Sequence, residues 1–200
     1  MTHPPHRDDA GAKLGMWLFL FTELILFGGL FLLYAIYLAR YPREFAAGGH
    51  ELNLLLGAAN TVVLLTSSLL AAMAVTAVQR DGRRATLLLL GGTILCAACF
   101  LGIKYVEWSA KIGHGIYPGS PRLTAGAPGE SVFFSLYYLT TGLHGLHVLI
   151  GGTILAWAAV RVARGRINGE NYIWLENGAL YWHLVDLVWI FIFPLYYLIL

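Results

Sequence analysis

Five long stretches of apolar residues, separated by short polar segments, dominate the pattern along the chain. They cover residues 14–38, 52–78, 86–108, 131–160 and 177–200. Each stretch reaches the roughly 20 residues that a helix needs to cross a hydrocarbon core. A segment inside lipid must be helical, because its backbone groups find no water to bond. The pattern predicts an all-α membrane protein, with a polar tail over residues 1–12 and a single domain of five transmembrane helices over residues 13–200.

The composition agrees with a membrane protein, because 58% of the residues are hydrophobic and only 12% are charged. The formal net charge is +2, and no dense run of basic residues suggests nucleic acid as a partner. Basic residues flank the predicted helices unequally. One side has Arg7, Lys13, Arg80, Arg83, Arg84, Arg161, Arg164 and Arg166, and the other has Arg40, Arg43, Lys111 and Arg122. This imbalance predicts a cytoplasmic N-terminus and an external C-terminus.

Glu23 is an ionisable residue within the first apolar stretch, about 13 Å from the start of that stretch. A charged carboxylate at this depth costs at least about 2.5 kcal/mol, so we expect the side chain to be protonated, paired or turned to a polar cavity. Two interpretations stay open. Glu23 is either an acid that exchanges protons or faces a lipid headgroup, or a neutral carboxyl hydrogen-bonded between helices.

Two further pairs of ionisable residues are three positions apart, which places the members of each pair on one face of a helix. For Lys104 and Glu107 we expect a salt bridge, with the lysine extending outward to the membrane surface. For His183 and Asp186 the alternatives are a proton relay, a metal ligand with its orienting carboxylate, and a lock between two helices.

The second predicted helix has polar side chains in its middle, which we expect to pack and to form hydrogen bonds between helices. They are Asn60, Thr61, Thr66, Ser67 and Ser68.

His144 and His147 are also three apart, and together with His183 they suggest a haem or metal site. A ladder of two b-type haems needs histidine pairs on two different helices, and the sequence offers only one such pair. Hydrogen bonding between helices is therefore the favoured role of His144 and His147. No catalytic residue and no metal ligand is predicted in this chain.

Taken together, the polar stretches resemble a known family. WLFLFTE contains Glu23, AANTVVLLTSS contains Asn60, and IKYVEW contains Lys104 and Glu107. YYLTTGLHGLHVLIGG contains His144 and His147, and ENGALYWHLVDLVWIF contains Glu176, His183 and Asp186. Residues 13–200 resemble subunit III of the haem–copper respiratory oxidases, in the form with five helices found in bacteria.

The resemblance implies an accessory subunit that binds no cofactor and supports the proton supply and durability of the catalytic subunit I. Haem and copper are expected in subunit I and its associated subunits, and structural phospholipid beside this chain. Glu23 matches the family's membrane-embedded glutamate at a lipid-filled cleft. Asn60, Lys104, Glu107, His144, His147, Glu176, His183 and Asp186 match its interhelical polar residues. Mitochondrial members have seven helices, and this chain lacks the first two. In those members the first two helices form one wall of the cleft. The expected location is the bacterial cytoplasmic membrane.

Three alternatives remain at this point. The chain could be the accessory protein of nitric oxide reductase, which belongs to the same family. It could be an independent haem or metal enzyme using His144, His147 and His183. It could also be a carrier coupled to protons through Glu23 and Asp186, although no inverted repeat supports this.

Overall fold

The computed structural model describes residues 9–198, and its main elements are five long helices. They are α1 (Asp9–Arg40), α3 (Leu54–Gln79), α4 (Arg83–Gly113), α6 (Pro128–Ala163) and α7 (Ile173–Tyr197). Each is long and apolar enough to cross a membrane, which confirms the predicted all-α protein with five spans. Helix α1 begins within the predicted polar tail. Residues 1–8 of that tail and residues 199–200 of the fifth predicted span lie outside the described residues.

Two short helices interrupt the connections at one end of the bundle. They are α2 (Pro42–His50) and α5 (Pro121–Ala125), and both begin with a proline, which suits the first turn of a helix. After α2, the Asn53 side chain accepts a hydrogen bond from the Leu56 amide at 3.1 Å and so caps the start of α3. Local signals of this kind turn the chain sharply back into the bundle.

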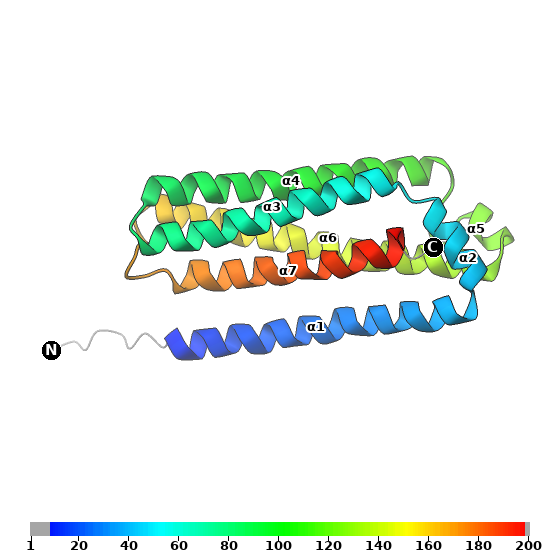
Figure 1. Cartoon of the computed structure of the whole chain (residues 1–200), viewed down its shortest axis with the longest axis horizontal. Helices are drawn as coiled ribbons and strands as arrows, with labels where there is room; N and C mark the ends of the chain where they lie inside the picture. The colour runs from blue at the N-terminus through cyan, green and yellow to red at the C-terminus, as the bar shows by residue number, and fades with distance from the viewer. Residues whose placement is uncertain (1–8, 199–200) are drawn as a thin grey trace.

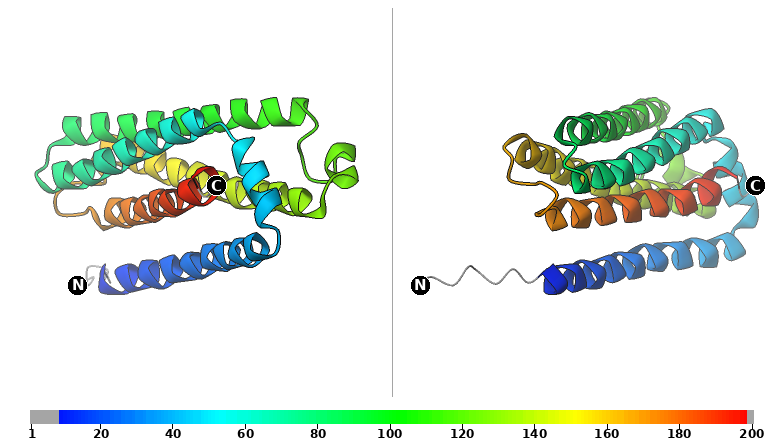
Figure 2. Two further views of the ribbon diagram at one scale, coloured as in Figure 1. Left: turned by 45° about the vertical axis from the view of Figure 1, so that its right-hand side comes forward. Right: turned by 60° about the vertical axis from the view of Figure 1, so that its left-hand side comes forward.

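Successive long helices run in opposite directions, so the start of α1 and the end of α7 lie at opposite ends of the bundle (Figure 1). We call the end where α1 begins the N-terminal end, and the end with α2 and α5 the far end. Helices α3, α4, α6 and α7 form the main bundle, and α1 lies along its edge beside α7 (Figures 1 and 2). In the most apolar 18-residue stretch of α7, 56% of the residues are buried. In the corresponding stretch of α1, only 17% are buried. Helix α7 thus lies at the centre of the bundle, and α1 is the most exposed of the five long helices.

Tryptophans of α7 bond to hydroxyl groups of α3 across the centre of the bundle. Trp189 Nε1 donates to Thr61 Oγ1 at 3.0 Å, and Trp182 Nε1 donates to Ser67 Oγ at 3.1 Å. Both indole rings are fully buried. The Thr66 hydroxyl instead donates to a carbonyl of its own helix. The predicted bonds between helices are therefore confirmed for Thr61 and Ser67.

Candidate functional site: buried ionisable groups between the helices

Glu23 of α1 is bound to His147 of α6. Its Oε2 lies 2.9 Å from His147 Nε2, and the two side chains are only 14% and 10% exposed. The rings of Phe27 and Tyr181 enclose the imidazole. The sequence singled out both residues but gave no sign that they meet, because 124 positions separate them.

The second nitrogen of His147 determines how this pair holds its protons. Nδ1 lies 2.7 Å from the carbonyl oxygen of Leu143, and a carbonyl can only accept a hydrogen bond. Nδ1 therefore carries a hydrogen, so a neutral imidazole offers a bare Nε2 to Glu23. Either Glu23 is protonated and donates to Nε2, or the carboxylate accepts from a protonated imidazole. In both states the pair shares one proton and has no net charge, as the hydrocarbon requires.

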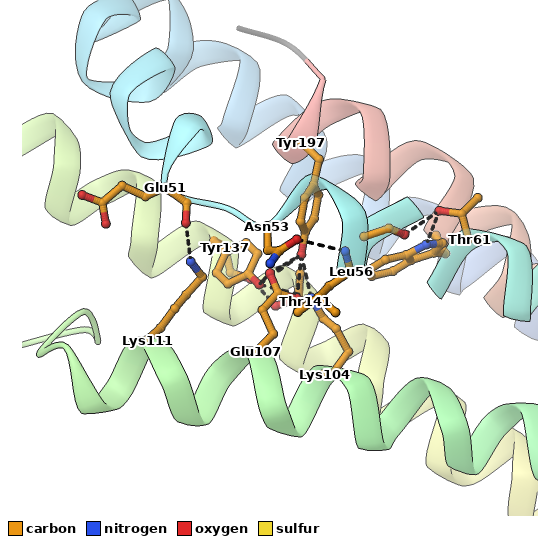
Figure 3. A network of polar contacts seen from close by, with 12 residues as sticks. Glu51, Asn53, Leu56, Thr61, Lys104, Glu107, Lys111, Tyr137, Thr141 and Tyr197 are labelled. Atoms are coloured by element: carbon orange, nitrogen blue, oxygen red, sulfur yellow. Dashed lines mark hydrogen bonds and ion pairs between the residues drawn. The ribbon is translucent and has the colours of Figure 1, made fainter. Parts of the chain in front are cut away.

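Lys104 and Glu107 of α4 are at the centre of a second buried group near the far end (Figure 3). Lys104 Nζ donates to Glu107 Oε2 at 2.9 Å, to the Tyr197 hydroxyl at 2.8 Å and to the Tyr137 hydroxyl at 3.1 Å. Both tyrosines also donate to Glu107, Tyr197 at 2.8 Å and Tyr137 at 3.0 Å. The group thus joins α4 to α6 and α7.

The predicted salt bridge is confirmed, but the predicted outward direction of Lys104 is wrong. The side chain is only 8% exposed and its ammonium lies over the Tyr137, Trp189 and Tyr197 rings. Several aromatic faces and three hydrogen bonds offset the cost of burying the charge, so an outward path offers no advantage. The i, i+3 spacing showed that Lys104 and Glu107 share one face of α4. It did not show that this face points into the bundle. Tyr137 and Tyr197 were not singled out from the sequence.

A pocket of about 410 Å³ reaches Glu107 of this group from the far end. It is bordered by Glu107 and by Lys111, one turn further along α4. Lys111 Nζ donates to the Glu51 carbonyl oxygen at 2.8 Å, and Arg122 bonds to the Glu51 carboxylate at 3.1 Å (Figure 3 for Lys111 and Glu51). Lys111 was counted in the sequence only as a basic residue of a connecting segment. In the structure it ties α4 to the α2–α3 turn.

His183 and Asp186 do not form the pair that their spacing suggested. His183 Nδ1 lies 2.8 Å from Ser68 Oγ of α3, which confirms the expected interhelical bond of Ser68. Asp186 is 3% exposed, and neither carboxyl oxygen has a partner at hydrogen-bond distance among the described residues. His183 therefore links α7 to α3 through Ser68 without involving Asp186.

His144 and Asn60 are completely buried, yet none of their side-chain nitrogens or oxygens has a hydrogen-bond partner within residues 9–198. The His144 ring instead packs against Phe100 and Trp189. Their interhelical hydrogen bonds stay a prediction. Glu176 is different, because its Oε1 lies 3.0 Å from Lys13 Nζ and links α7 to α1 at the N-terminal end.

The three histidines of the haem or metal alternative do not converge. Both nitrogens of His147 are in hydrogen bonds, and Nδ1 of His183 faces Ser68. Within the described part of the chain, no group of three or more histidine, cysteine, aspartate and glutamate side chains is arranged to hold a metal ion.

Comparison with known proteins places this arrangement in a family. The pattern of cytochrome c oxidase subunit III matches residues 3–199. The chain is 33% identical to the heme-copper oxidase subunit I+III of Aeropyrum pernix, over 98% of this chain but 24% of that longer protein. It is 30% identical to cytochrome c oxidase subunit 3 of Thermostichus vulcanus, over 98% of this chain and 89% of the relative.

A third relative is subunit 3 of the cytochrome bo(3) ubiquinol oxidase of Pseudomonas aeruginosa, which is 30% identical over 96% of this chain and 88% of its own length. These relatives are subunits of oxidases, and they give no support to the nitric oxide reductase alternative. The match extends over all five long helices and includes every buried ionisable group described above. The chain belongs to the cytochrome c oxidase subunit III family, the accessory subunit of haem–copper oxidases.

Proposed function

We propose that this chain assembles beside the haem–copper catalytic subunit I of a terminal oxidase in a bacterial cytoplasmic membrane. The A. pernix relative supports this partner, since its name joins subunits I and III in one protein. Haem and copper would reside in the partner subunits, and this chain would hold no metal of its own. Membrane lipids, with a structural phospholipid among them, would cover the apolar side chains exposed on α1, α4 and α6.

The Glu23–His147 pair carries the more specific part of the proposal. It fastens the loosely packed α1 to α6 and holds one shared proton inside the membrane. In the proposed role the pair stabilises the subunit and supports the proton supply of the catalytic subunit. Glu23 is turned to an imidazole of its own chain, which favours this role over a contact with a lipid headgroup.

Purification through an affinity tag in a mild detergent tests the partner. We expect a haem–copper catalytic subunit to copurify, with its haem absorption and its copper, and mass spectrometry would identify it. Recovery of a nitric oxide reductase catalytic subunit instead would contradict the oxidase assignment. Haem in stoichiometric amount on the isolated chain would contradict the accessory role.

The role of Glu23 is tested in the assembled complex by Glu23→Gln. We expect slower proton uptake and faster inactivation during turnover, because an amide holds no exchangeable acidic proton. Glu176→Gln is the matched control, since it removes a carboxylate of α7 whose partner Lys13 is 41% exposed. If Glu23→Gln leaves turnover, proton uptake and inactivation unchanged, the proposed role of this pair fails.

A further inference from the structure

A groove of about 530 Å³ runs between α1 and α7, on the outer side of the contact between these helices. Its walls include Trp17 and Phe21 of α1 and Leu184 and Leu187 of α7. Trp17 and Phe21 are 59% and 61% exposed, so the groove opens towards the lipid. This volume is within the range of small-molecule sites, roughly 300–1,000 Å³.

His183 is the one polar residue on the wall of this groove. Its Nδ1 faces Ser68, and its Nε2 makes no hydrogen bond with any described residue. His183 borders the open groove, so the free side of its ring is reachable from the lipid. An imidazole nitrogen facing hydrocarbon without a partner is unfavourable, and the groove therefore favours an occupant with a hydrogen-bonding group.

The depth of His183 restricts what that occupant can be. Helices α1 and α7 run in the same direction, and the Lys13–Glu176 ion pair joins their starts at the N-terminal end. His183 is two helical turns beyond Glu176, or about 10 Å deeper. In a hydrocarbon core about 30 Å thick, this position lies below the level of phospholipid headgroups. The matching polar group must belong to a molecule whose head enters the hydrocarbon.

We propose that the α1–α7 groove binds an isoprenoid quinone or quinol, with its ring beside Trp17 and Phe21 and an oxygen on His183 Nε2. The imidazole suits both forms of the ligand. With its hydrogen on Nε2 it donates to a quinone carbonyl, and in the other tautomer it accepts from a quinol hydroxyl. The aromatic side chains offer stacking surfaces, and the leucines contact the isoprenoid tail. The inference concerns binding alone and is independent of the proposed partner.

The experiment is a titration of the purified full chain in detergent with decylubiquinone, with native mass spectrometry to count the bound molecules. We expect one saturable site per chain. His183→Leu is expected to weaken binding about tenfold through the lost hydrogen bond, whereas His183→Gln, which keeps a donor and an acceptor, restores most of it. Leu187→Phe fills the groove and should abolish binding.

The matched control is Leu95→Phe, the same substitution at a 65% exposed position of α4, which should leave binding unchanged. Fluorescence gives a second readout, because quinones quench indole emission and Trp17→Phe should remove the saturable part of the quenching. Equal affinity of His183→Leu and the unmodified chain would overturn the proposal. So would equal displacement of decylubiquinone by phosphatidylglycerol, which would identify the groove as an acyl-chain site.

Discussion

At the scale of single residues, both nitrogens of His147 are engaged, one with the Leu143 carbonyl and one with Glu23. These bonds to both ring nitrogens and to Glu23 Oε2 lower the cost of placing the pair in lipid. A replacement of Glu23 is tolerated to the extent that its side chain can still donate a hydrogen bond to His147 Nε2. Substitutions at Glu23 therefore separate the hydrogen bond from the exchangeable proton.

Glu23→Gln should lower the free energy of unfolding by less than about 1 kcal/mol, because its amide still donates to Nε2. Glu23→Leu should lower it by about 1–3 kcal/mol, because the imidazole nitrogen is left buried and unpartnered. Unfolding of the purified chain in mixed detergent micelles measures both. Equal losses for the two variants would show that the pair is not held by the hydrogen bond described.

The group around Lys104 makes a different prediction. Lys104→Met leaves the Glu107 carboxylate buried without its cation, which should cost about 3–5 kcal/mol. The double variant Lys104→Met/Glu107→Leu removes both charges and should be markedly more stable than the single variant. The same unfolding experiment on Lys104→Met, Glu107→Leu and the double variant measures the energetic coupling between the two side chains. Additive losses would contradict a buried, mutually dependent pair.

The sequence identified most members of these groups, because an ionisable residue in an apolar stretch is conspicuous. It did not identify their partners. Glu23 and His147 meet only through the packing of α1 on α6, and the tyrosines beside Lys104 resemble any aromatic residues near a helix end. The direction of the Lys104 side chain could not be predicted either, because a lysine can point to the membrane surface or into the bundle from the same backbone position.

At the scale of elements, the five spans could be read from hydropathy because each exceeds the membrane thickness. The short helices α2 and α5 could not, since with nine and five residues they form no long apolar stretch. Close approach of helices depends on single glycines. At Gly151 of α6, an added Cβ would lie 2.8 Å from the Trp182 ring of α7, whereas at Gly91 of α4 it would meet nothing within 4 Å.

Gly151→Ala should therefore destabilise the chain by about 1–3 kcal/mol, because the fully buried Trp182 ring has no room to shift. Gly91→Ala is the control, and it should be neutral or slightly stabilising because alanine favours the helix. The midpoint of thermal unfolding in detergent compares the two. A loss of equal size at Gly91 would point to a general effect of glycine replacement and contradict the specific contact.

At the scale of the whole molecule, five crossings place the start of α1 and the end of α7 at opposite ends. The arginine-rich segments 80–84 and 161–166 lie at the N-terminal end with Lys13, and the pocket beside Glu107 lies at the far end. The group around Lys104 and Glu107 thus lies nearer the far end, whereas Glu23 lies at the level of the α1–α7 groove, whose wall includes Phe21 and Leu24. Orientation decides which of them lies nearer the cytoplasm.

The basic residues predict that the N-terminal end is cytoplasmic. Single cysteines introduced at Gly165 and at Gly119, in a chain without Cys96 and Cys99, test this with a thiol reagent that cannot cross the membrane. In intact cells we expect labelling at Gly119, at the far end, and none at Gly165. The reverse pattern would invert the topology and place the Glu23–His147 pair in the outer half.

Helix α1 precedes the other long helices in the chain, whereas the long helices that it contacts most, α6 and α7, follow α3 and α4. During synthesis Glu23 lacks its partner His147 until α6 has been made. Attachment of α1 is consequently a late event in biogenesis. Until α6 and α7 are made, the face of α1 that packs on them in the folded chain stays uncovered.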